Sequence, residues 1–264
     1  MKFPTYVDEH DKLDRSINSF ATESFRDQAD RDYIAARLAC RAELFPQFLW
    51  ASHQSIEKYL KAILLYNRVK ATTIKHDLEK AMLLVKTLPF TIELSSRSRS
   101  FIDQITTYGE FRYIDIPYHV HGHILIDLDL TVWELRRYCQ VLKVLGKKLP
   151  LHEQSMLDEA KSNLSKSSTE PRHKFRLHGG LLEKILSDIT HPSRSALLWN
   201  NAVYGVRKRA TVRVKRHMHA QNPLLYLYPE MLDEIVKYVF IPGKLASGYR
   251  DHLARIKADP KSRP

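Results

Sequence analysis

The sequence predicts an all-α protein: an antiparallel bundle of four to five helices, followed by a smaller, mostly helical, basic C-terminal region. Two observations carry this prediction. Apolar residues recur at steps of three and four along several segments, which is the period of one helix face. Turn residues stand mainly between these segments, so the links are short, as the antiparallel helices of a bundle require.

The helices are expected in the following order. Ile17–Leu44 holds two apolar-periodic pieces, and Pro46 separates them from the next helix because proline removes a backbone donor. His121–Leu145 is expected to be the longest helix, stopped by Gly146 and Pro150. Further helices are predicted over residues 47–66, 77–88 and 98–108, and residues 109–120 are expected to form a loop.

The best-specified segment is Trp50–Tyr66, with the sequence WASHQSIEKYLKAILLY. Its apolar residues fall on one helix face, whereas Glu57 and Lys61 lie off that face and form a favourable pair four residues apart. Asp77 is placed to cap or begin the next helix, which Pro89 ends. Taken alone, this pattern describes an ordinary amphipathic core helix.

Composition changes along the chain suggest three parts. Residues 1–150 are expected to form the helical bundle, and the polar, Ser- and Lys-rich residues 151–175 a helix tail running into a linker. Residues 176–264 form a basic C-terminal region whose fold the sequence does not specify. Its short helix candidates are residues 181–189 and 231–240, and the alternation at residues 211–215 fits a strand or a basic helix edge.

The formal net charge is +12 and is unevenly distributed. Residues 1–150 have 22 Lys and Arg against 19 Asp and Glu, whereas residues 151–264 have 20 against 11. A basic surface attracts phosphate backbones without reading their sequence, so the second half is the better candidate for contact with nucleic acid. The alternative is that the positive excess only keeps the protein in solution.

Several classes are disfavoured by composition. No run of eighteen apolar residues is present, so no transmembrane helix and no membrane partner is expected. The N-terminal residues have no apolar core of a signal peptide. Cys40 and Cys139 are too few for a disulfide framework, and we expect both to be reduced packing residues of a cytoplasmic protein.

The polar residues of the best-specified segment resemble those of HEPN domains, which are small all-α domains. The segment HQSIEKYLKAILL, followed by KHDL, is similar to the second helix and the next helix start of that family. The matching residues are Gln54, Glu57, Lys58, Leu60, Lys61, Ala62, His76, Asp77 and Leu78. The similarity covers roughly residues 20–145. It implies a link to bacterial toxins, to toxin–antitoxin systems and to partners of nucleotidyltransferases.

The resemblance also implies where a catalytic site would lie. HEPN ribonucleases have an Arg-x(4–6)-His motif at the mouth of their last helix, and Arg112 and His119 match it with six intervening residues. It implies that these two residues are catalytic, in a composite site that a homodimer completes. We expect His53, Glu57, Lys58 and Tyr113 to support the cleft.

The chemistry that the resemblance implies is endoribonuclease cleavage without a metal or other cofactor. A histidine titrates near neutrality and can move a proton to or from the 2′-hydroxyl or the leaving oxygen. An arginine can hold the scissile phosphate through two hydrogen bonds. In the alternative interpretation, Arg112 binds the start of the last helix or a nearby carboxylate, Asp115 or Glu110. The domain would then be a non-catalytic module that binds RNA, a nucleotide or a partner protein, such as an antitoxin or a nucleotidyltransferase.

Three alternating histidines, His119, His121 and His123, also suggest a metal site. Too few acidic residues and no cysteine lie close to them in the sequence, so we expect no metal here. A second candidate surface lies in the basic C-terminal region, where Tyr204, Tyr226 and Tyr228 could stack on unpaired bases. Its proposed nucleic-acid-binding residues are Arg207, Lys208, Arg209, Arg213, Lys215 and Arg216; the alternative is a solvated charged face.

Overall fold

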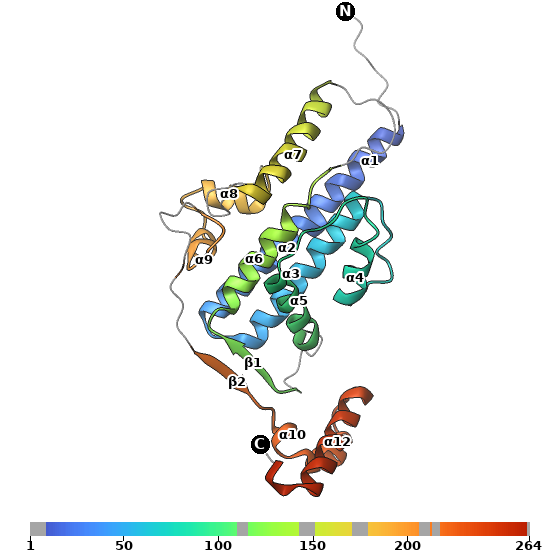
Figure 1. Ribbon diagram of the computed structural model, residues 1–264, viewed down its shortest axis with the longest axis vertical. Coiled ribbons are helices and arrows are strands. Elements are labelled where there is room, and N and C mark those ends of the chain that lie inside the picture. The colour runs from blue at the N-terminus through green and yellow to red at the C-terminus, as the bar shows by residue number, and fades with distance from the viewer. Residues whose placement is uncertain are drawn as a thin grey trace, which may run out of the picture. The chain divides into compact units, whose positions relative to one another are not determined.

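The computed structural model describes residues 9–109, 116–142, 151–170, 179–205, 212 and 217–262. These residues fold as two compact units. The bundle unit takes its residues from Met1–Glu110 and His123–Val214, and the ribbon unit takes its residues from Phe111–Gly122 and Lys215–Pro264. Almost all of the regular secondary structure in the described chain is helical, which confirms the predicted all-α class (Figure 1).

The bundle unit contains the helices predicted from the sequence. Figure 1 shows α2, α3, α5 and α6 running alongside one another, with α3 in contact with the other three. The elements are α1 (Glu9–Phe20), the π-helix η1 (Ala21–Arg26), α2 (Asp27–Arg41), α3 (Phe45–Tyr66), α4 (Leu78–Val85), α5 (Ser96–Gly109), α6 (Ile124–Arg136), α7 (Leu151–Thr169), α8 (Leu181–Ser187) and α9 (Arg194–Leu198).

Helix α3 forms the centre of the core because its apolar residues face the bundle on several sides. Its buried residues include Phe48, Ile56, Leu60 and Ile63, each fully shielded from solvent. Helix α4 then begins as its sequence predicts. The side chain of Asp77 accepts a hydrogen bond from the backbone N–H of Lys80 at 2.9 Å, which satisfies one of the free donors at the helix start.

The last predicted bundle helix is shorter than expected. Helix α6 ends at Arg136, and the predicted loop over residues 109–120 contains part of a strand, β1 (Tyr118–His121). The longest described helix is α3, not the last one. The predicted helix was wrong at its start because His121 pairs with a strand almost one hundred residues later, which local periodicity cannot reveal. Residues 143–150 lie outside the described residues.

The ribbon unit consists of two paired strands and a small helical cluster. Strand β1 pairs antiparallel with β2 (Met218–Gln221). The chain continues through α10 (Leu224–Leu227), the 3-10 helix η2 (Pro229–Met231), α11 (Leu232–Ile235), α12 (Gly243–Ala258) and the 3-10 helix η3 (Pro260–Ser262). These helices enclose a small core of Leu225, Leu232, Leu245, Ala246 and Tyr249.

The C-terminal half differs from its sequence-based outline in two further respects. The segment 151–175, expected to run from a helix tail into a linker, is helical over Leu151–Thr169. The described strand is Met218–Gln221, and of the residues 211–215 proposed as a strand or helix edge only Val212 is described. The helix predicted over 231–240 ends at Ile235.

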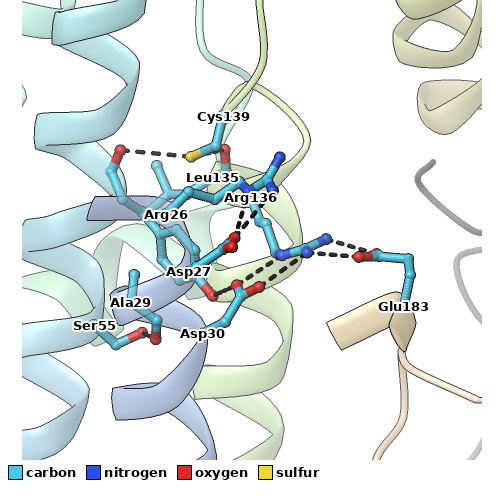
Figure 2. Close-up of polar contacts among 10 residues, drawn as sticks. Arg26, Asp27, Ala29, Asp30, Ser55, Leu135, Arg136, Cys139 and Glu183 are labelled. Atoms are coloured by element: carbon cyan, nitrogen blue, oxygen red, sulfur yellow. Dashed lines mark hydrogen bonds and ion pairs between the residues drawn. The ribbon is translucent and has the colours of Figure 1, made fainter. Parts of the chain in front are cut away.

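Two buried arginines attach residues 179–205 to the bundle. Arg136 pairs with Asp30 of α2 on one side and with Glu183 of α8 on the other (Figure 2). Arg37 of α2 pairs with Asp129 of α6 and donates to the backbone carbonyl of Ala196 at 3.0 Å. A buried charge is tolerated only when it is paired and hydrogen-bonded, so these contacts fix the segment on the bundle.

Candidate active site

His119, the histidine of the predicted motif, lies on strand β1 of the ribbon unit. It stands opposite Ala220 of β2, and its side chain is exposed. Side chains alternate between the two faces of a strand, and residues opposite each other share a face. The buried face of the ribbon therefore carries Tyr118 and Val120, whereas His119 belongs to the open face.

His121 lies on the same open face, two residues along the strand. Its ring centroid is 5.1 Å from that of His119, and the two ring planes meet at 73°. Met218, which stands opposite His121, is exposed as well. The ladder continues past His121, because the backbone N–H of Gly122 donates to the carbonyl of His217 at 2.9 Å. The strand pairing thus places two imidazoles next to each other at the surface of this unit.

Most of the remaining predicted site residues lie outside the described residues. This is true of Arg112 and Tyr113, and of all six residues of the proposed nucleic-acid surface, Arg207, Lys208, Arg209, Arg213, Lys215 and Arg216. Their roles stay predictions. Of the three tyrosines proposed to stack on bases, Tyr204 is buried in the bundle, Tyr226 stacks on His252 at 4.5 Å between ring centroids, and Tyr228 is exposed.

Glu57 is the centre of a separate polar cluster on α3 in the bundle unit. It is buried; its Oε1 accepts a hydrogen bond from Lys61 Nζ at 2.5 Å, and its Oε2 pairs with His76 Nδ1 at 3.1 Å. Lys61 also donates to the backbone carbonyl of Lys75 at 2.7 Å. The cluster therefore joins α3 to the chain just before α4. Lys58 faces elsewhere and pairs with Asp32 of α2.

His53 is buried one turn before Glu57. Its side chain is 1% exposed, its ring stacks parallel to that of Trp50, and Nδ1 lies 3.9 Å from a Glu57 oxygen. Neither ring nitrogen has a hydrogen-bond partner among the described residues. Burial lowers the pKa of His53, and the nearby Glu57 carboxylate opposes that shift. The ring is therefore favoured in its neutral form within the folded protein.

A third group lies at the start of α6, and only its histidine, His123, was named from the sequence. Asp127 is mostly buried, pairs with Arg97 of α5, and lies 3.6 Å from His123 Nε2. His123 precedes Asp127 by four residues, a spacing that puts both on one helix face. This i,i+4 pattern was visible in the sequence, but the pairing with Arg97 depends on how α5 packs on α6.

The described residues contain no group of three or more His, Cys, Asp or Glu side chains arranged to hold a metal ion. The alternating histidines divide instead between two settings: His119 and His121 on the strand, and His123 at the start of α6. Burial raises the pKa of the Cys139 thiol well above its ordinary value and that of Cys40 to about 11, so both are in the unreactive thiol form near neutrality.

The fold of the bundle unit is that of an all-helical bundle domain, and comparison with known families makes this assignment specific. Residues 22–142 match the model of the HEPN domain family, so this part of the chain is a HEPN domain. The match contains α2 to α6 together with the strand that carries His119. No curated protein and no solved structure matched the chain. Among the described helices, none combines the length and apolar character needed to cross a bilayer.

Proposed function

We propose that the protein is a metal-independent endoribonuclease of the cytoplasm that acts as a homodimer, with Arg112 and His119 as its catalytic residues. The observation that carries the proposal is the position of His119 on the open face of the ribbon, within a HEPN domain. An exposed imidazole can reach a substrate and exchange a proton with it, which a buried histidine such as His53 cannot do without a rearrangement.

The proposed reaction is transesterification at one phosphodiester linkage of RNA. The 2′ oxygen loses its proton and forms a bond to phosphorus, while the bond from phosphorus to the 5′ oxygen breaks and that oxygen gains a proton. His119 transfers one of these two protons, and the guanidinium of Arg112 offsets the charge that builds on the phosphate. Because the nucleophile is the 2′-hydroxyl, DNA should not be cleaved.

The test compares the wild-type protein with His119→Ala and Arg112→Ala on a mixture of RNAs in EDTA. Wild-type protein should cleave RNA, and each variant should lose about 10²–10⁴-fold in rate. His217→Ala and Arg99→Ala are matched controls, because both side chains are exposed and neither lies in the motif. A wild-type protein that binds RNA but leaves it intact would overturn the proposal.

The second candidate is a non-catalytic HEPN module that binds RNA, a nucleotide or a partner protein such as an antitoxin or a nucleotidyltransferase. The contacts of α3 favour this candidate, because Glu57 and Lys58 are both engaged within the bundle unit. Residues held in this way contribute to the fold rather than to a cleft. Under this candidate, His119→Ala would leave binding unchanged, and wild-type protein would produce no cleaved RNA.

A further inference from the structure

We propose that His121 is a second catalytic residue, and that His119 and His121 of the same protomer act as the general base and general acid of one cleavage site of the homodimer. The inference rests on the proposed ribonuclease function and adds a residue to its site. Its basis is the strand that places the two imidazoles on the same open face, with ring centroids 5.1 Å apart.

The reaction needs two proton transfers, and one histidine cannot perform both at the same moment. A neutral imidazole must take the proton from the 2′-hydroxyl as its oxygen attacks phosphorus. An imidazolium must give a proton to the 5′ oxygen as that oxygen leaves. Charge and protons then balance, and the two histidines exchange their protonation states in each cleavage.

The geometry of β1 suits this division of labour. The attacking and leaving oxygens lie on opposite sides of one phosphorus atom. The two proton-transferring groups must therefore be close enough together for each to reach a different oxygen of the same phosphate. Residues two apart on a strand are separated by about 7 Å along the backbone and point to the same side. Pairing with Met218 and Ala220 of β2 holds His119 and His121 in this arrangement.

The side chains of the open face are exposed to solvent in this unit. Ala220 opposite His119 has a small side chain, and Met218 opposite His121 is 62% exposed. The other face of the ribbon is closed by Tyr118 and Val120, so a phosphate can approach the two imidazoles only from the open side. The pair is therefore placed where a flexible single strand can be positioned against it.

The experiment uses RNA that wild-type protein cleaves, together with the same RNA carrying sulfur in place of the bridging 5′ oxygen at the cleaved linkage. A thiolate leaves without being protonated, so this substrate needs no general acid. We expect His119→Ala and His121→Ala each to lose about 10²–10⁴-fold on ordinary RNA. The sulfur substrate should restore cleavage by one of the two variants and not by the other.

His217→Ala is the matched control, because it removes an exposed histidine of the same unit that lies outside the two catalytic positions of β1, and it should cleave both substrates like the wild type. Wild-type cleavage of ordinary RNA should also show a bell-shaped dependence on pH that loses one limb in His121→Ala. Cleavage of ordinary RNA by His121→Ala at the wild-type rate would overturn the inference alone. The inference would also be overturned if the sulfur substrate restored cleavage by neither variant, or by both. Absence of cleavage by the wild-type protein would overturn the proposed function itself.

Discussion

Arg136, the last residue of α6, donates two hydrogen bonds to Asp30 of α2: Nε to Oδ1 at 2.8 Å and Nη2 to Oδ2 at 3.0 Å. Both side chains are fully or almost fully buried. The other edge of the same guanidinium is held by both oxygens of Glu183, each at 2.6 Å. One arginine therefore joins α2, α6 and α8 (Figure 2).

Removing the negative charge of Asp30 should destabilise the bundle unit. Asp30→Asn preserves the volume of the side chain but leaves a buried guanidinium short of a partner, and breaking such a pair costs about 3–5 kcal/mol. The protein has three tryptophans, Trp50, Trp133 and Trp199, all within the bundle unit. Their fluorescence during urea unfolding therefore measures the stability of this unit.

Asp103→Asn is the control for that measurement. Asp103 lies on α5, where its side chain is exposed, so its replacement should change the free energy of unfolding by less than about 0.5 kcal/mol. Equal effects of the two substitutions would show that the Asp30–Arg136 pair does not stabilise the bundle.

A second prediction concerns Gly180, which passes close to the same arginine. Its φ is +115°, and a Cβ added there would lie 2.5 Å from Arg136 Nη2. Gly180→Ala should therefore destabilise the bundle unit by about 1–3 kcal/mol through backbone strain and displacement of the ion pair. Gly179→Ala separates these causes: its φ is +71°, but no atom lies within 4 Å of the added Cβ. The loss in Gly179→Ala should be the smaller of the two in urea unfolding.

The sequence predicted those parts of the fold whose signals are local. Helix α3 was expected over 47–66 and spans Phe45–Tyr66, because an uninterrupted apolar face fixes it. The role of residues 179–205 could not be predicted, because Arg136 and Glu183 are far apart in the sequence and neither has a local signature of pairing. Helix α7 is longer than the helix tail expected there, because the sequence of a polar helix with few apolar residues resembles that of a linker.

Only the part of the candidate site that has a local pattern in the sequence could be predicted. The motif spacing drew attention to His119, and its resemblance to a family motif required no knowledge of the fold. The side-by-side placement of His119 and His121 depends on β1 forming a strand, and that strand exists through its pairing with residues 218–221. In a helix start, as expected from periodicity, residues two apart would have faced different directions.

A third prediction follows from the lowered pKa of His53. Its folded-state pKa lies below the unfolded value of about 6.5, so the unfolded chain binds a proton that the folded protein does not. At pH values well above 6.5, His53 is neutral in both the folded and the unfolded state and does not change the free energy of unfolding. As pH falls through 6.5 towards the folded-state pKa, it should progressively destabilise the bundle unit.

His53→Leu removes this titration and keeps an apolar side chain in the buried position. Urea unfolding at pH 7.5 and pH 5, followed by tryptophan fluorescence, should show a smaller loss of stability on acidification in the variant than in the wild type. The same loss in both proteins would mean that other groups account for the acid sensitivity.

The last prediction concerns the basic segment that contains Arg207, Lys208 and Arg209. Replacing all three with glutamine should weaken binding to single-stranded RNA and flatten its salt dependence, because a protein that contacts fewer phosphates releases fewer counterions when it binds. For three contacts the slope of log K against log salt should fall in magnitude by about 2. A variant with Lys70, Lys86 and Lys161 replaced by glutamine is matched in charge and changes exposed positions of the bundle unit. Binding titrations from 50 to 300 mM salt should give a smaller slope for the variant of residues 207–209 than for the variant of Lys70, Lys86 and Lys161. Equal slopes for the two variants would show that the charge of the whole chain attracts RNA, rather than a surface formed by this segment.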